Sequence, residues 1–129
     1  MNTISAVLLI KIFITVVFLA GPFLLLPQAR LAARLGLSGN TALILRLYGV
    51  AMLALAVAYA SGVWQAAQGV FPWGIVLVGI LSNGGATVVL AVCASRPVKR
   101  VAVPVFAVIS LAFAACALLP NAALAAWLS

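Results

Sequence analysis

Long apolar stretches separated by short polar breaks are the dominant pattern along this chain. A helix that crosses the hydrocarbon core of a membrane needs about 20 mostly apolar residues. Four stretches have this character, and we predict that each is a transmembrane helix. They are Ile4–Leu26, Thr41–Trp64, Pro72–Ala94 and Val101–Leu119. The predicted fold class is therefore all-α: a polytopic membrane protein whose single domain, residues 1–129, forms a four-helix transmembrane bundle.

Helix-breaking residues lie between the predicted spans. Pro27 closes the first span. Gly69 lies in a short uncharged turn before Pro72, and proline suits the first position of a helix. Residues 95–97, Ser-Arg-Pro, end the third span, and Pro120 interrupts the fourth span near its exit. These breaks agree with the boundaries of the apolar stretches.

Positive charges give the expected orientation of the spans. Lys and Arg occur in the first and third predicted loops, and the N-terminal segment, the middle loop and the C-terminal tail have none. The loop residues are Arg30, Arg34, Arg96, Lys99 and Arg100. Because cytoplasmic loops are enriched in Lys and Arg, we expect both termini on the non-cytoplasmic side. Trp64, Trp73 and Trp127 would then all lie at the outer boundary, where tryptophan is enriched.

Composition supports a membrane protein and limits its chemistry. Of the 129 residues, 68% are hydrophobic and 5% are charged, whereas soluble domains have about 45–50% and about 25%. All seven charged residues are Lys or Arg, and the chain contains no Asp, Glu or His. Carboxylate and imidazole groups carry most general acid–base catalysis and metal binding. We therefore expect no enzymatic activity, no cofactor and no metal site.

The basic charge is expected to contact membrane lipid. Nucleic-acid binding needs a soluble basic face, and here the charges interrupt apolar runs instead, so nucleic acid is excluded as a partner. Anionic headgroups of the inner leaflet would contact the loop residues. The Ala-, Leu- and Val-rich composition and the lack of an organelle-targeting segment favour a bacterial inner membrane.

Lys11 is the most unusual polar residue because it lies inside the first predicted span, between isoleucines, with Thr15 on the same face. A charge at the centre of a membrane is unfavourable by about 2.5–3.5 kcal/mol on insertion scales. Four outcomes are open for Lys11. It reaches outer-leaflet headgroups, faces a wet cavity, binds an anion, or pairs with an acidic residue of another chain.

The third span holds a second polar segment, Ser82-Asn83-Gly84-Gly85-Ala86-Thr87, close to its midpoint. Adjacent glycines weaken a helix, and broken helices at the midplane line solute sites in transporters. The segment is therefore either a broken helix at a solute site or a kink whose polar groups are satisfied by neighbouring helices.

Arg46 lies near the cytoplasmic end of the second span, and we expect it to reach the inner headgroups.

Small residues at steps of three and four favour close helix packing in lipid. The predicted packing positions are Gly49, Ala51, Ala54, Ala58, Gly79, Gly84 and Gly85. Tyr48 and Tyr59 lie on a bulkier face of the second span, where a quinone or lipid would pack against an aromatic surface.

Cys93 and Cys116 are expected at depths about 20 Å apart, too far for a disulfide.

Parts of the first half resemble a known group of membrane proteins. The segments Leu19–Pro27, Leu35-Gly36-Leu37 and Leu45–Val50, the last containing Arg46-Leu47-Tyr48-Gly49, are similar to the small four-helix DoxX-like families. The resemblance implies a four-helix bundle and an association with quinone-linked or thiol-handling oxidoreductases. The resemblance implies that Arg46, Tyr48 and Gly49 form a structural signature. It implies no active-site motif in this chain.

Two functions follow from these observations. The first is a non-enzymatic accessory or structural subunit that packs against a larger membrane protein partner; the alternative assembly is a homo-oligomer. The second is a small channel or carrier for an anion, a lipid or another small solute. Its candidate intramembrane polar residues are Lys11, Thr15, Arg46, Tyr48, Tyr59, Ser82, Asn83 and Thr87.

Overall fold

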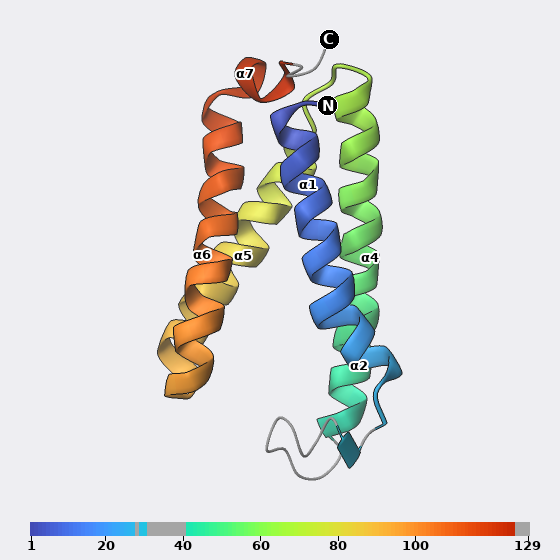
Figure 1. The fold of residues 1–129 in the computed structure, drawn as a ribbon, viewed down its shortest axis with the longest axis vertical. Coiled ribbons are helices and arrows are strands. Elements are labelled where there is room, and N and C mark those ends of the chain that lie inside the picture. Colours follow the sequence, from blue (N-terminus) through green and yellow to red (C-terminus); the bar gives the residue numbers. More distant parts are fainter. Residues whose placement is uncertain (28, 31–40, 126–129) are drawn as a thin grey trace. The chain divides into compact units, whose positions relative to one another are not determined.

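Helices make up most of the residues that the computed structural model describes, which are 1–27, 29–30 and 41–125 (Figure 1). The first span is composite, because α1 (Thr3–Ile14) continues as the π-helical segment η1 (Thr15–Ala20) and then as α2 (Gly21–Leu25). The remaining helices are α4 (Thr41–Ala67), α5 (Trp73–Cys93), α6 (Arg96–Leu118) and the short α7 (Pro120–Leu124).

Four helices within the described residues are long and apolar enough to cross a membrane, as predicted. They cover Thr3–Leu25, Leu43–Ala67, Trp73–Cys93 and Arg96–Leu118. The all-α fold class and the presence of four candidate spans are therefore confirmed. The single domain and the side of the membrane on which the termini lie stay predictions.

The beginning of the fourth span differs from the prediction. Helix α6 begins at Arg96 instead of Val101, so Arg96, Lys99 and Arg100 lie in its first turns and not in a loop. Ser95 adopts an extended conformation and precedes Pro97, which lies at the start of the helix where its missing N–H is tolerated. The connection from α5 is consequently reduced to Ala94 and Ser95. Pro120 begins α7 and interrupts the fourth span as predicted.

The second span also extends further than predicted, to Ala67 instead of Trp64. Gly69, with a φ of 76°, ends it in the left-handed conformation. The N–H of Val70 donates to the carbonyl of Gln65, and the N–H of Gly69 donates to that of Ala66. This is a Schellman motif, which satisfies the last carbonyls of a helix and favours glycine at its turning residue.

The described residues form two compact units. The first comprises Leu9–Ser61, with the end of α1, η1, α2 and most of α4. Its buried side chains include Ala20, Ala56 and Tyr59. Phe23 of α2 packs against Tyr48 of α4 with ring centroids 5.7 Å apart, so α2 and the beginning of α4 are in direct contact.

The second unit comprises Met1–Leu8 and the described residues from Gly62 onward. Helices α5 and α6 form its main contact and lie side by side in Figure 1. Ile4, Leu8, Val76 and Phe113 are completely buried there. Gly62 lets three segments meet, because a Cβ on it would lie 3.0 Å from Ile75 and 3.1 Å from Leu8.

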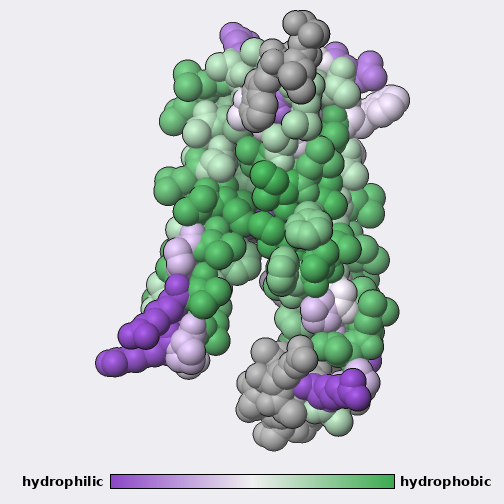
Figure 2. All heavy atoms as spheres, viewed as in Figure 1, coloured by the Kyte–Doolittle hydropathy of each residue, from purple (hydrophilic) through white to green (hydrophobic). Residues whose placement is uncertain are grey.

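Most side chains of the four spans face outward. Between 11 and 33% of the residues in the most apolar window of each span are buried. Figure 2 shows apolar side chains over most of the visible helix surface, and hydrophilic side chains gathered near the helix ends. Such a surface is suited to hydrocarbon or to other membrane helices and not to water.

Candidate functional site

The polar side chains of the spans fall into three groups. Two groups lie in the unit Leu9–Ser61: Lys11 with Thr15, and Arg46 with Tyr48. The third lies in the other unit and surrounds Asn83. Each group is described from its own contacts.

Arg46 binds the end of α2. Its guanidinium donates from Nη1 to the carbonyl oxygen of Leu24 and from Nη2 to that of Leu26, the latter at 3.1 Å. These carbonyls lie at the C-terminal end of α2, where the last carbonyls of a helix have no partner within the helix. A cation is also favourable at the negative end of a helix. These two bonds direct the side chain to the chain's own backbone, and the contact of Arg46 with headgroups stays a prediction.

Tyr48 and Gly49 contact the same end of α2. The Tyr48 ring packs on Phe23, and a Cβ on Gly49 would lie 3.0–3.1 Å from Leu24 and Phe23. Arg46, Tyr48 and Gly49 therefore act together as a packing and capping group. Tyr59 does not join Tyr48 on an open aromatic face, because it is completely buried and Tyr48 is 45% exposed.

The Asn83 group forms several hydrogen bonds within its own helix. Asn83 is completely buried, and its Nδ2 donates to the carbonyl of Gly79 at 2.7 Å and to Ser82 Oγ at 3.3 Å. Thr87 Oγ1 donates to the carbonyl of Asn83 at 2.8 Å. Helix α5 is continuous through this segment, so the broken helix that the glycines suggested is not present. The hydroxyl of Ser110 in α6 donates to the carbonyl of Ile80 at 3.3 Å and links the two helices.

Lys11 and Thr15 are buried near the middle of the first span. Lys11 is 3% exposed and Thr15 is 0% exposed. Thr15 is the residue at which α1 becomes the π-helical segment η1. Its Oγ1 has no hydrogen-bond partner within the described residues. Residues four apart on a helix share a face, so a positive charge and an unsatisfied hydroxyl lie on one side of the span.

The predicted packing residues behave in two ways. Gly49 and Gly79 are buried in close contacts, Gly84 lies near Ser110, and Ala58 is half-buried. The other three are exposed, and their packing against another helix stays a prediction: Ala51, Ala54 and Gly85. They lie on helix faces that no other described segment covers.

The basic residues expected at the inner headgroups are mostly exposed. Arg30, Arg96 and Arg100 are exposed and Lys99 is half-buried, whereas Arg34 and Trp127 lie outside the described residues. Their contact with anionic lipid stays a prediction. In the described part of the chain, no group of three or more His, Cys, Asp or Glu could hold a metal ion.

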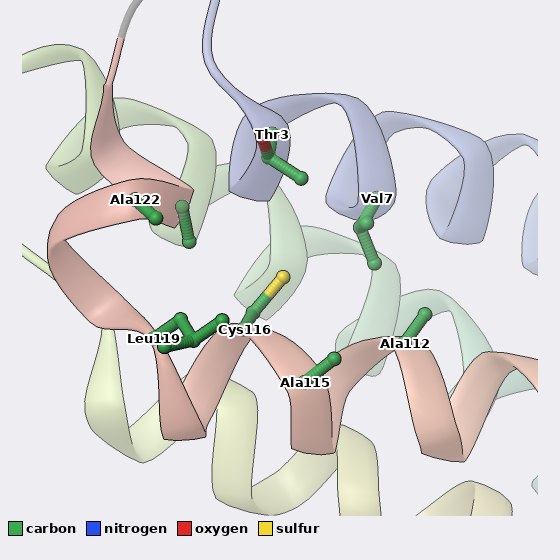
Figure 3. Close-up of a pocket in the computed structure, with 8 residues that line it drawn as sticks. Thr3, Val7, Ala112, Ala115, Cys116, Leu119 and Ala122 are labelled. Carbon is green, nitrogen blue, oxygen red and sulfur yellow. The ribbon is translucent and has the colours of Figure 1, made fainter.

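A cavity of about 290 Å³ lies under α7 in the unit that contains α5 and α6. Figure 3 shows its walls: Thr3 and Val7 of α1, Cys116 of α6, Leu119 between α6 and α7, and Ala122 of α7. Cys116 is buried and Cys93 is exposed, and both are free thiols. Its walls are mainly apolar and contain no charged residue, so the cavity is suited to hydrocarbon.

Some of the polar contacts were not apparent in the sequence. Asn2 accepts from the N–H of Ser5 at 3.0 Å and donates to the carbonyl of Ala66 at 3.2 Å. Asparagine just before an apolar run is a known N-cap signal, so the first contact was predictable in principle. The bond to Ala66 and the bond from Ser110 to Ile80 depend on tertiary packing, which no local pattern indicates.

These observations define a small all-helical chain with four candidate membrane spans. The four spans indicate an integral membrane protein. No protein-family model, curated protein or solved structure matches the chain.

Proposed function

We propose that this chain is a non-enzymatic accessory or structural subunit of a larger membrane complex. The observation that carries the proposal is the exposed small-residue face of α4. Ala51, Ala54 and Ser61 are exposed and Ala58 is half-buried. Small residues at this spacing allow a second helix to approach closely in lipid, where association depends on packing and not on the hydrophobic effect.

The bonding of the polar side chains supports a packing role over a solute pathway. Arg46 caps α2, and Asn83 and Thr87 donate to carbonyls of their own helix. A channel or carrier, the alternative function, would use such groups to coordinate a solute, and a broken helix would free backbone groups for the same purpose. Because α5 is continuous, the Asn83 segment favours the subunit over the carrier.

We further propose a location and an orientation for this subunit. Its exposed apolar spans and one-signed charge suit a bacterial inner membrane with both termini on the non-cytoplasmic side. Arg30, Arg96 and Arg100 are exposed at helix ends, which supports contact with anionic headgroups of the inner leaflet.

Substitution on α4 tests the subunit role. Ala54→Leu adds bulk to the small-residue face and should reduce co-purification of the partner by about ten-fold, the effect of overpacking a close interface. Ala60→Leu is the matched control, since Ala60 is also exposed on α4 but lies about 120° around the helix. Equal recovery of the partner with Ala54→Leu, Ala60→Leu and the native chain would contradict the proposal.

A further inference from the structure

The Thr15 hydroxyl is an exception among the hydroxyl groups of the spans. Ser61, Ser82 and Thr87 each donate to the carbonyl three or four residues earlier, at 2.7, 3.3 and 2.8 Å respectively. This bond is the usual way in which a helix satisfies a hydroxyl in an apolar environment. Thr15 Oγ1 is buried without such a bond or any other partner in the described residues. Among the described residues, its hydrogen-bonding capacity is therefore unused.

The backbone changes at the same residue. Helix α1 ends at Ile14, and the segment from Thr15 to Ala20 is π-helical, with the N–H of Gly21 donating to the carbonyl of Val16. π-Helical segments are rare and are frequently found at functional sites. The position is also central, because Ile14 is the middle residue of the span Thr3–Leu25.

Lys11 adds a positive charge to this face. It lies one helical turn before Thr15 and is 3% exposed. The chain has no Asp or Glu, so no acidic side chain of this protein neutralises an ammonium group there. Both side chains are donors, since an ammonium group donates three hydrogen bonds and accepts none, and a hydroxyl donates one. Two donors and one positive charge on a shared buried face are complementary to an oxyanion.

We propose that Lys11 and Thr15 bind a singly charged oxyanion group, a carboxylate or a phosphate, within the first span. The ammonium of Lys11 supplies the charge, and the hydroxyl of Thr15 donates to an oxygen of the anion. A free small anion and a lipid headgroup share this chemistry. The central depth favours the free anion, because headgroups lie at the edges of the hydrocarbon core. The site is independent of the subunit role, since it uses a different helix from the small-residue face of α4.

Lysine side-chain NMR tests the site directly, because Lys11 and Lys99 are the only lysines of the chain. The full chain is labelled with ¹⁵N-lysine and placed in phosphatidylcholine nanodiscs, and Lys99→Arg assigns the two Nζ signals. Titration with sodium acetate or inorganic phosphate should shift the Lys11 signal to saturation and leave Lys99 unchanged. In a second arm, phosphatidylglycerol is added without either salt, and a Lys11 shift there assigns the oxyanion to a lipid headgroup.

Two variants separate the proposed role of Thr15 from a general effect of salt. Thr15→Val keeps the shape but removes the hydroxyl, and should weaken the apparent affinity by about ten-fold, as expected for one hydrogen bond to a charged group. Thr15→Ser keeps the hydroxyl and should bind within about two-fold of the native chain. The proposal is wrong if no probe produces a saturable shift or if Lys99 responds equally. It is also wrong if Thr15→Val binds as tightly as Thr15→Ser, or if Lys11 responds only when another protein is bound.

Discussion

The ring of Phe113 in α6 lies against the backbone of Gly79 in α5. A Cβ on Gly79 would be 2.7 Å from Cδ2 and Cε2 of Phe113, closer than carbon atoms approach without a shift of one group. Both residues are buried. The close contact between α5 and α6 therefore depends on glycine at position 79.

Gly79→Ala should destabilise the α5–α6 contact. The added methyl group must displace the Phe113 ring or separate the helices, and overpacking of this kind reduces stability by about 1–3 kcal/mol. The expected result is a lower melting temperature in detergent, measured by circular dichroism at the helical signal.

Gly85→Ala is the matched control in the same helix. A Cβ on Gly85 would meet nothing within 4 Å. Because alanine favours a helix over glycine by about 1 kcal/mol, this variant should be at least as stable as the native chain. Equal destabilisation by both substitutions would contradict the assigned role of Phe113.

Removal of the Arg46 guanidinium should destabilise the end of α2. Arg46→Met leaves the carbonyls of Leu24 and Leu26 without their donors, and a hydrogen bond to a charged group contributes about 1.5–3 kcal/mol. Arg46→Lys keeps the charge but loses the planar fork, so its stability should be intermediate. Arg100→Met is the control, since Arg100 is exposed and its loss should change stability by less than about 0.5 kcal/mol. The capping role is wrong if Arg46→Met unfolds at the same denaturant concentration as Arg100→Met.

The two bonds of Asn2 can be separated by substitution. Asn2→Asp keeps an acceptor for the N–H of Ser5 but loses the donor to the carbonyl of Ala66. Asn2→Ala loses both and should cost about 1 kcal/mol more for the missing cap. Chemical denaturation of the two variants measures this difference. Equal stability of Asn2→Asp and Asn2→Ala would show that the cap contributes little.

Thiol labelling tests the predicted orientation. Cys93 is exposed at the end of α5 that precedes the basic residues, whereas Cys116 is buried. A membrane-impermeant maleimide should label Cys93 in inside-out vesicles and not in right-side-out vesicles. Asn121→Cys in a Cys93→Ser background should show the reverse, because Asn121 is exposed in α7 after the fourth span. Labelling of both positions from one side would contradict the four-span topology.

The positions of the spans were predictable because length and hydropathy alone define a membrane-crossing helix. Their ends were less predictable, since local conformation decides them. Helix α6 begins at Arg96, five residues before Val101, with Pro97 in its first turn, and Gly69 ends α4 through a Schellman motif after three additional residues. Hydropathy contains no information about either event.

Polar residues of interest were also identified from the sequence, but their roles were not. Lys11 and Thr15 were selected because they interrupt an apolar run, and the structure adds their burial and the π-helical turn at Thr15. The capping bonds of Arg46 were not foreseen because its partners, the carbonyls of Leu24 and Leu26, lie about 20 residues away in the chain. Tertiary contacts of this kind cannot be inferred from periodicity within one helix.

Mass spectrometry of the chain extracted gently from its native membrane is the most direct test of the proposed subunit role. We expect a larger integral membrane protein to be recovered with the native chain at a fixed stoichiometry. Its recovery with the Ala54→Leu variant should be strongly reduced. Recovery of this chain alone, or of a homo-oligomer that carries only lipid, would contradict the proposal of a subunit in a larger complex.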